Sequence, residues 1–203
     1  FAYSYTSDFA DSTEFQLADP EILINSLLPD ETLFLRIYAA NGCGLSAPLE
    51  VNYSIENISC ERFEQNVQVP ILDLDTAMIP IPVNLQGPLA STTIHKIRGT
   101  HSWTSDLTVH FYFDPMRQIE LLDGDCPFAS DFDLGFSDLG LEDLECPLTS
   151  GNLYQPKSPF SAWNGSIGVD TFWLQIEDTQ SADEGMLDYI DIEVCTREAN
   201  GGF

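Results

Sequence analysis

The residues with the clearest chemical potential lie in and beside the segment between Cys126 and Cys146, where carboxylates are dense and Lys and Arg are absent. Wherever the backbone is extended, an Asp-x-Asp spacing places both carboxylates on one side. Oxygen donors on a flexible, strongly negative loop favour Ca²⁺ over zinc or copper. We therefore predict calcium as the cofactor, with a solvated acidic loop held by a disulfide as the alternative. The acidic residues are Glu120, Asp123, Asp125, Asp131, Asp133, Asp138, Glu142, Asp143 and Glu145.

Signals for catalysis are weaker. Gly99-Thr100-His101 is similar to the histidine segment of subtilisin-like proteases, but the sequence has no Gly-x-Ser-x-Gly nucleophile elbow and no separate aspartate segment. It has no His-Glu-x-x-His zinc motif either. We therefore expect His101 to lie in a strand and expect no catalysis in this chain, although a protease domain elsewhere in a parent protein is compatible with this expectation.

Binding through aromatic side chains is a further hypothesis. Tryptophan faces stack on sugar rings, and Trp103 and Trp163 are the candidates for such ligand stacking. Packing inside a core is the alternative for each tryptophan, including Trp173, which alternates out of phase with Phe172 and Leu174.

Composition limits the partners. The 203 residues include 33 acidic and 7 basic ones, giving a formal charge of −26, so phosphate backbones and anionic bilayers should be repelled. We expect no nucleic-acid partner and no membrane insertion, since no apolar run approaches the ~20 residues that span a bilayer. The sequence opens on Phe1 with neither an initiator Met nor a signal peptide, which predicts an interior fragment of a longer protein.

Hydrophobic residues recur with a period of two, which is the pattern of half-buried strands. Clear examples are the apolar positions of 107–113, 172–176 and 190–194, and no segment shows a sustained helical spacing. The predicted fold class is all-β, built as two sandwiches with a boundary near Ile55 to Ser59.

The first region resembles a fibronectin type III domain. The residues on which the resemblance rests are Leu27-Leu28-Pro29, then Thr32-Leu33-Phe34-Leu35-Arg36-Ile37, Ala39-Ala40-Asn41, and Ser46-Ala47-Pro48 before a final strand. The resemblance implies that 1–55 is the C-terminal part of such a domain, serving as a spacer. Phe34 stands where the family commonly has a tyrosine, and it cannot make the hydrogen bond of that hydroxyl.

The second region resembles the P domain, or homo B domain, of kexin-like and furin-like proteases, a module that also occurs without a protease in large secreted bacterial proteins. The resemblance implies a jelly-roll β-sandwich over 60–197, with 198–203 as the start of a linker. The segments that carry it are Thr100-His101-Ser102-Trp103-Thr104-Ser105-Asp106-Leu107, Gly151-Asn152-Leu153-Tyr154-Gln155-Pro156, Pro159-Phe160-Ser161-Ala162-Trp163-Asn164-Gly165 and Asp183-Glu184-Gly185-Met186-Leu187.

The departures from the family pattern concern turns and packing. They are Arg117 where a glycine is usual, Val169-Asp170 where Asn-Gly is common, and Tyr189 where a tryptophan is common. P domains are commonly calcium-bound, and Asp106 lies in a Ser-Asp-Leu step that the family shares. The predicted metal ligands are Asp106, Asp123, Asp125, Asp131, Asp133 and Asp138.

Five cysteines in an acidic, strand-rich chain favour an oxidising compartment, and thus a secreted or cell-surface protein. We predict disulfides between Cys126 and Cys146, which bracket the acidic loop, and between Cys60 and Cys195, which bracket the P-like domain. Cys43 is left over, either bonded to a part of its domain outside this chain or present as a buried free thiol. The absence of a Cys-x-x-Cys or Cys/His cluster argues against zinc.

Three functions remain open from the sequence. The first is a non-catalytic, calcium-stabilised structural or adhesive module of a large secreted or surface protein, with neighbouring domains of its own chain as partners. The second is an accessory P domain that stabilises an exported protease. The third is a carbohydrate-binding module, for which other copies of the chain or cell-surface glycans are further possible partners.

Overall fold

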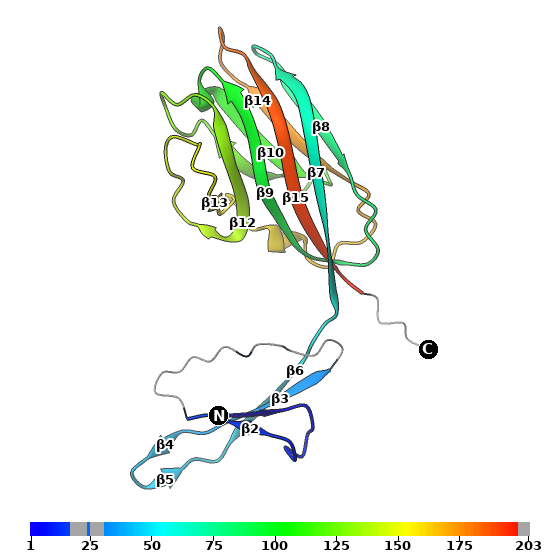
Figure 1. The fold of residues 1–203 in the computed structure, drawn as a ribbon, viewed down its shortest axis with the longest axis vertical. Coiled ribbons are helices and arrows are strands. Elements are labelled where there is room, and N and C mark those ends of the chain that lie inside the picture. Colours follow the sequence, from blue (N-terminus) through cyan, green and yellow to red (C-terminus); the bar gives the residue numbers. More distant parts are fainter. Residues whose placement is uncertain (17–23, 25–30, 199–203) are drawn as a thin grey trace. The chain divides into compact units, whose positions relative to one another are not determined.

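The computed structural model describes residues 1–16, 24 and 31–198, and it confirms the all-β class (Figure 1). The chain divides into two compact units, Phe1–Ile58 and Ser59–Phe203. Leu27-Leu28-Pro29, which opens the fibronectin-like pattern, and most of the expected linker at 198–203 lie outside the described residues. No helix in the described part of the chain is long and apolar enough to cross a membrane.

The first unit contains one four-stranded sheet with the order β2-β1-β3-β6, and a separate short hairpin, β4-β5. Leu33 and Ala2 are its buried apolar side chains among the described residues. Phe34 lies in the middle of the sheet, opposite Ser4 on one side and Asn52 on the other. The strands are β1 (Ala2–Ser4), β2 (Thr13–Glu14), β3 (Thr32–Ile37), β4 (Ala40–Asn41), β5 (Gly44–Leu45) and β6 (Leu49–Ser54).

The second unit is a two-sheet sandwich with the sheet orders β13-β12-β9-β15-β7 and β11-β10-β14-β8. Two short 3₁₀ helices, η1 (Thr104–Asp106) and η2 (Phe160–Trp163), lie in its connections. The strands are β7 (Ile58–Ile71), β8 (Thr76–Pro82), β9 (Leu89–His101), β10 (Leu107–Tyr112), β11 (Ile119–Asp123), β12 (Phe132–Leu141), β13 (Leu153–Tyr154), β14 (Thr171–Asp178) and β15 (Gly185–Arg197).

The core of the sandwich follows the period-two pattern. In β14, Phe172, Leu174 and Ile176 are fully buried while the residues between them are only partly covered. Apolar residues of both sheets join one cluster, to which Phe111 contributes a ring stacked on Phe172 at 5.0 Å between centroids. The predicted inward faces of 172–176 and 190–194 are thereby confirmed, and that of 107–113 is confirmed as far as Phe111, because Phe113 is only partly buried.

The segment between Cys126 and Cys146 is not the loop that its acidity indicates. Its central residues form β12, which pairs with β9 inside the larger sheet. Phe132, Leu134 and Phe136 are buried at alternating positions, so burial of apolar side chains fixes a strand despite the carboxylates between them. Asp131 has a left-handed backbone (φ 61°), so the predicted side-by-side placement of its carboxylate with that of Asp133 does not hold.

Both predicted disulfides are present. Cys60–Cys195 joins β7 to β15, and Cys126–Cys146 closes the acidic segment. Cys43 is an exposed free thiol, so the expectation of a buried thiol is wrong. Two disulfides fit an oxidising, extracellular environment.

Candidate functional site

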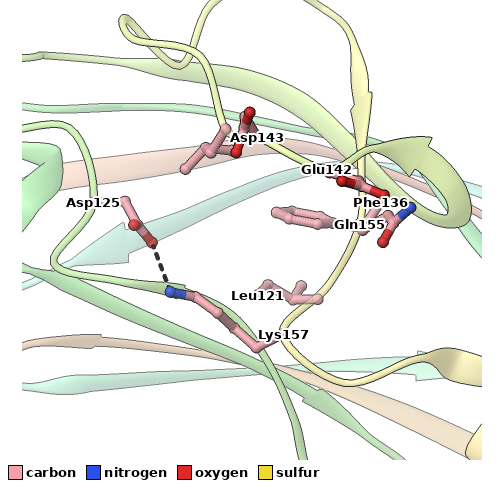
Figure 2. A pocket seen from close by; sticks show the side chains of 8 residues that line it. Leu121, Asp125, Phe136, Glu142, Asp143, Gln155 and Lys157 are labelled. Carbon is pink, nitrogen blue, oxygen red and sulfur yellow. Dashed lines mark ion pairs between the residues drawn. The ribbon is translucent and has the colours of Figure 1, made fainter.

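A cleft of about 340 Å³ is lined by residues from β11, from the segment between Cys126 and Cys146, and from 155–157 (Figure 2). Apolar side chains of β11, β12 and the following segment contribute to its lining, and carboxylates and one amine approach from the sides. Its lining consists of Leu121, Asp125, Phe136, Glu142, Asp143, Leu144, Gln155 and Lys157. The cleft therefore combines an apolar surface with strong negative charge.

Lys157 supplies a positive charge that the acidic segment itself lacks. Its amino group lies 3.9 Å from the Asp125 carboxylate, as Figure 2 shows, and its backbone N–H donates to the Glu120 carbonyl at 3.1 Å. The lysine side chain is half exposed, so this ion pair contributes at most about 1 kcal/mol. Lys157 follows Cys146 by only eleven positions, but it lies outside the acidic interval whose composition predicts the site.

Three of the predicted ligands come from two segments that hydrogen bonds hold together. The Asp123 N–H donates to the Asp125 carboxylate at 2.9 Å, and the Gly124 N–H donates to the Leu107 carbonyl at 3.1 Å. Thr108 donates to Asp123 at 3.4 Å, and Asp106 accepts from Ser105 at 3.3 Å. Gly124 has a left-handed backbone (φ 66°) and passes close to the Ser105 carbonyl, which lets the two segments approach.

Asp133 and Asp138 serve other contacts. Asp133 forms an ion pair with Lys96 of the neighbouring strand β9 at 3.0 Å. Asp138 accepts two backbone N–H bonds at the start of η2, from Phe160 at 2.6 Å and from Ser161 at 2.8 Å. Each carboxylate thus already has charged or N–H partners within the protein.

The predicted six-ligand calcium site does not assemble as one cluster. Among the described residues, the only three His, Cys, Asp or Glu side chains whose ligand atoms lie within 4.8 Å of one another are Cys60, Glu193 and Cys195, and the two cysteines there form a disulfide. The chemistry of the set, all oxygen donors, suits calcium, but its geometry does not fit a single ion bound by all six carboxylates. Four of the predicted ligands pair with neither Lys96 nor the N–H groups of η2: Asp106, Asp123, Asp125 and Asp131.

The tryptophans differ sharply in environment. Trp163 is 2% exposed, packs against Phe111 and Phe113, and donates its indole N–H to the Arg117 carbonyl at 3.1 Å. Its predicted role in ligand stacking is therefore wrong, because the surrounding aromatic core covers its faces. Trp103 is 40% exposed and keeps an edge contact with Phe128, whose ring centroid lies 5.6 Å away.

His101 lies in β9, as expected, and its side chain is fully buried. Its Nε2 faces the Asp178 carboxylate at 3.4 Å, and its Nδ1 lies 2.8 Å from the Trp103 carbonyl. Asp178 belongs to β14, so this pair connects the two sheets of the sandwich. The His101 imidazole is therefore buried between the two sheets.

A second charged cluster joins β7 and β15. Arg62 donates through two nitrogens to Asp191, and this hydrogen bonding raises the pKa of the guanidinium above its ordinary value. The Tyr189 hydroxyl donates to Glu64 at 2.9 Å, and the bond raises the pKa of the phenol, because ionisation would destroy the donor beside a carboxylate. Both bonds link strands that the Cys60–Cys195 disulfide also joins.

Comparison with known proteins leaves the family unassigned. No protein-family model matches the chain, and no curated protein matches it. A similar solved structure is that of the complex between Aeromonas sobria serine protease and the chaperone, with a TM-score of 0.46 and 12% identity. The match covers 80% of this chain and 33% of that chain, so this chain spans about a third of the length of the protein it matches.

Proposed function

We propose that this chain is a non-catalytic structural and adhesive part of a larger secreted or surface protein, in which a fibronectin-like spacer precedes a P-domain-like sandwich. The observation that carries the proposal is the double closure of the sandwich. One disulfide joins its first strand to its last, and the other closes the acidic segment that contains β12. Such closure suits a module that keeps its shape outside the cell.

The placement of His101 supports the non-catalytic part of the proposal. A histidine that acts as a general base must reach the proton that it removes. His101 instead pairs with Asp178 between the two sheets, with both side chains fully buried. A protease assay on the intact chain with an unfolded protein substrate tests this point, and we expect no hydrolysis above that of a His101→Gln variant.

Calcium belongs to the proposal as a weak stabiliser at the acidic end of the sandwich. The supporting residues are Asp106, Asp123 and Asp125, which two hydrogen-bonded segments bring to one region. A ligand that binds only the folded state adds RT ln(1 + [L]/Kd), which is about 2.7 kcal/mol at a hundredfold excess over Kd. Since these carboxylates do not converge in the structure, we expect a smaller gain at millimolar calcium.

Thermal unfolding of the oxidised chain in calcium and in chelator, at matched ionic strength, tests the calcium proposal. We expect a lower Tm in chelator, and we expect the difference to vanish in an Asp123→Asn/Asp125→Asn variant. Glu61→Gln, which removes an exposed charge on β7, is the matched control and should keep the difference. An unchanged Tm for the parent chain would remove calcium from the proposal and leave the structural role intact.

An accessory role beside a protease domain is the second candidate, and one surface feature favours it. Met116 is 90% exposed and Ile167 is 75% exposed. Their turns are joined by a bond from Arg117 to Ser166 at 3.0 Å. Neighbouring exposed apolar side chains suit a surface that another domain covers.

Titration of the chain with the protease domain of its own parent protein, followed by calorimetry, tests the accessory role. We expect Met116→Asp and Ile167→Asp to weaken binding. Leu74→Asp is the control, because Leu74 is also exposed but lies at the opposite end of the β8–β14 pair. Equal binding by all three variants would exclude this surface.

A further inference from the structure

An exposed aromatic pair lies at the end of the sandwich that carries η1. Trp103 and Phe128 are 40% and 85% exposed, and their rings meet edge to face at an interplanar angle of 69° with centroids 5.6 Å apart. An apolar ring that is almost fully exposed contributes little to folding, because little of its surface leaves water. The pair therefore requires an explanation other than core packing.

The backbone holds this pair in place. Phe128 adopts a left-handed conformation (φ 68°), which is strained for a residue with a side chain. The Thr104 N–H donates to the Ala129 carbonyl at 2.9 Å, and the Asp131 N–H donates to the His101 carbonyl at 3.2 Å. Cys126, two residues before Phe128, is fixed by its disulfide. The residues that follow Phe128 are thus hydrogen-bonded to the chain on both sides of Trp103.

The segments around the pair are strongly acidic, and Lys157, which lies 3.9 Å from Asp125, reaches them from outside. Hydrogen bonds join four connecting segments at this end, 72–76, 101–106, 123–131 and 178–184. These segments contain no Lys or Arg, and their one histidine, His101, is buried. Their acidic residues are Asp73, Asp75, Asp106, Asp123, Asp125, Asp131, Asp178, Asp183 and Glu184, of which Asp178 is buried against His101.

We propose that Trp103 and Phe128 bind an arginine-bearing basic segment of a partner protein. Aromatic faces attract cations, and a guanidinium can stack on one ring while its N–H groups reach carboxylates such as Asp131. The edge-to-face angle gives a notch rather than a flat two-ring platform for a sugar. The acidic surroundings repel anionic glycans and add nothing for neutral ones, whereas they steer a basic segment to the site.

This binding goes beyond the proposed structural role, and it does not need calcium. An ion at Asp123 and Asp125 would instead lower the local negative charge and weaken it. The two ideas are therefore separable, because chelator should destabilise the fold under the calcium proposal but strengthen binding of the basic segment.

The test is a titration of the full chain, in chelator and at low salt, with a blocked peptide of alternating arginine and glycine. A blocked peptide of alternating glutamine and glycine is the neutral probe. The indole N–H signal of Trp103 in two-dimensional NMR is the readout. We expect the arginine peptide to shift this signal, the glutamine peptide to leave it unchanged, and added salt to weaken the shift.

Variants assign the binding to the rings. Phe128→Leu keeps an apolar side chain but removes the aromatic face, and we expect it to weaken affinity about threefold to fivefold. Asp131→Asn should weaken affinity and reduce its salt dependence. Met116→Ala is the control and should bind normally, because Met116 is exposed beyond the opposite end of β10.

Two outcomes would overturn the proposal. One is equal binding by the parent chain and Phe128→Leu, with melting curves showing that both are folded. The other is a shift of the Trp103 signal by a neutral oligosaccharide but not by the arginine peptide, which would make the pair a sugar site.

Discussion

The two units use the same local signals but bury very different amounts of apolar surface. In the described part of 1–58, Leu49, Tyr53 and Leu45 are 60%, 58% and 70% exposed. In the second unit, the alternating apolar residues of two facing sheets meet in one cluster. Alternation therefore predicts a strand in both units, but only a second layer converts one apolar face into a core. We expect the second unit to carry most of the stability.

The largest effect should follow loss of the Cys60–Cys195 disulfide. The bond closes a loop of 135 residues, for which the chain-entropy estimate is about 5 kcal/mol, against about 3 kcal/mol for the 20-residue loop of Cys126–Cys146. In urea unfolding, the double variant Cys60→Ser/Cys195→Ser should lose more stability than Cys126→Ser/Cys146→Ser. The reverse order would show that closure of the acidic segment contributes more to stability than the link between β7 and β15.

The next largest effect should follow truncation of Trp163, and it should distinguish the stability of the second unit from that of the first. Trp163→Ala removes a fully buried ring from an aromatic cluster, and we expect a loss of about 3–5 kcal/mol in the second unit. All three tryptophans lie in that unit, so tryptophan fluorescence reports its unfolding alone. Leu33→Ala is the matched truncation in the first unit and should leave the fluorescence transition unchanged. A shift of that transition by Leu33→Ala would mean that the units unfold together.

A smaller effect should distinguish a structural carboxylate from one available to a ligand. Asp138→Ala removes the acceptor of two N–H bonds at η2, and we expect a loss of about 1–2 kcal/mol. Asp131→Asn removes the charge of an exposed carboxylate but keeps a side chain that tolerates the left-handed backbone at this position (φ 61°), and it should cost little. Urea midpoints in chelator measure both changes, and similar losses would contradict the division of the acidic residues made from their contacts.

The smallest effect concerns pH. The bond from Tyr189 to Glu64 raises the phenol pKa, so its stabilisation is present below the ordinary value near 10 and is lost as the pH rises through the raised value. Stability should fall in this alkaline range, and Tyr189→Phe should reduce the fall. Urea unfolding at pH values on either side of 10 checks this expectation. A fall of equal size in both proteins would assign it to other groups.

Carboxylate density misled the interpretation of the segment between the disulfide cysteines. Its acidity indicated a loop, but Phe132, Leu134 and Phe136 alternate at buried positions, and that alternation was the signal of a strand. The contacts of the predicted calcium ligands also depend on partners that lie far away in the sequence. Lys96 engages Asp133, and the N–H groups of η2 engage Asp138, although neither partner is predictable from the spacing of the acids.

By itself the sequence predicted the all-β class, the inward faces within 107–113, 172–176 and 190–194, and the two disulfide pairs. The class and the faces follow from local alternation, and the pairs follow from cysteines that bracket the acidic segment and the P-like region. Only the tertiary structure decided that Trp163 is core while Trp103 is exposed, that His101 is sealed against Asp178, and that Lys157 meets Asp125. The physical reason is that burial and pairing depend on which segments the second sheet brings together, and residue spacing along one strand does not contain that information.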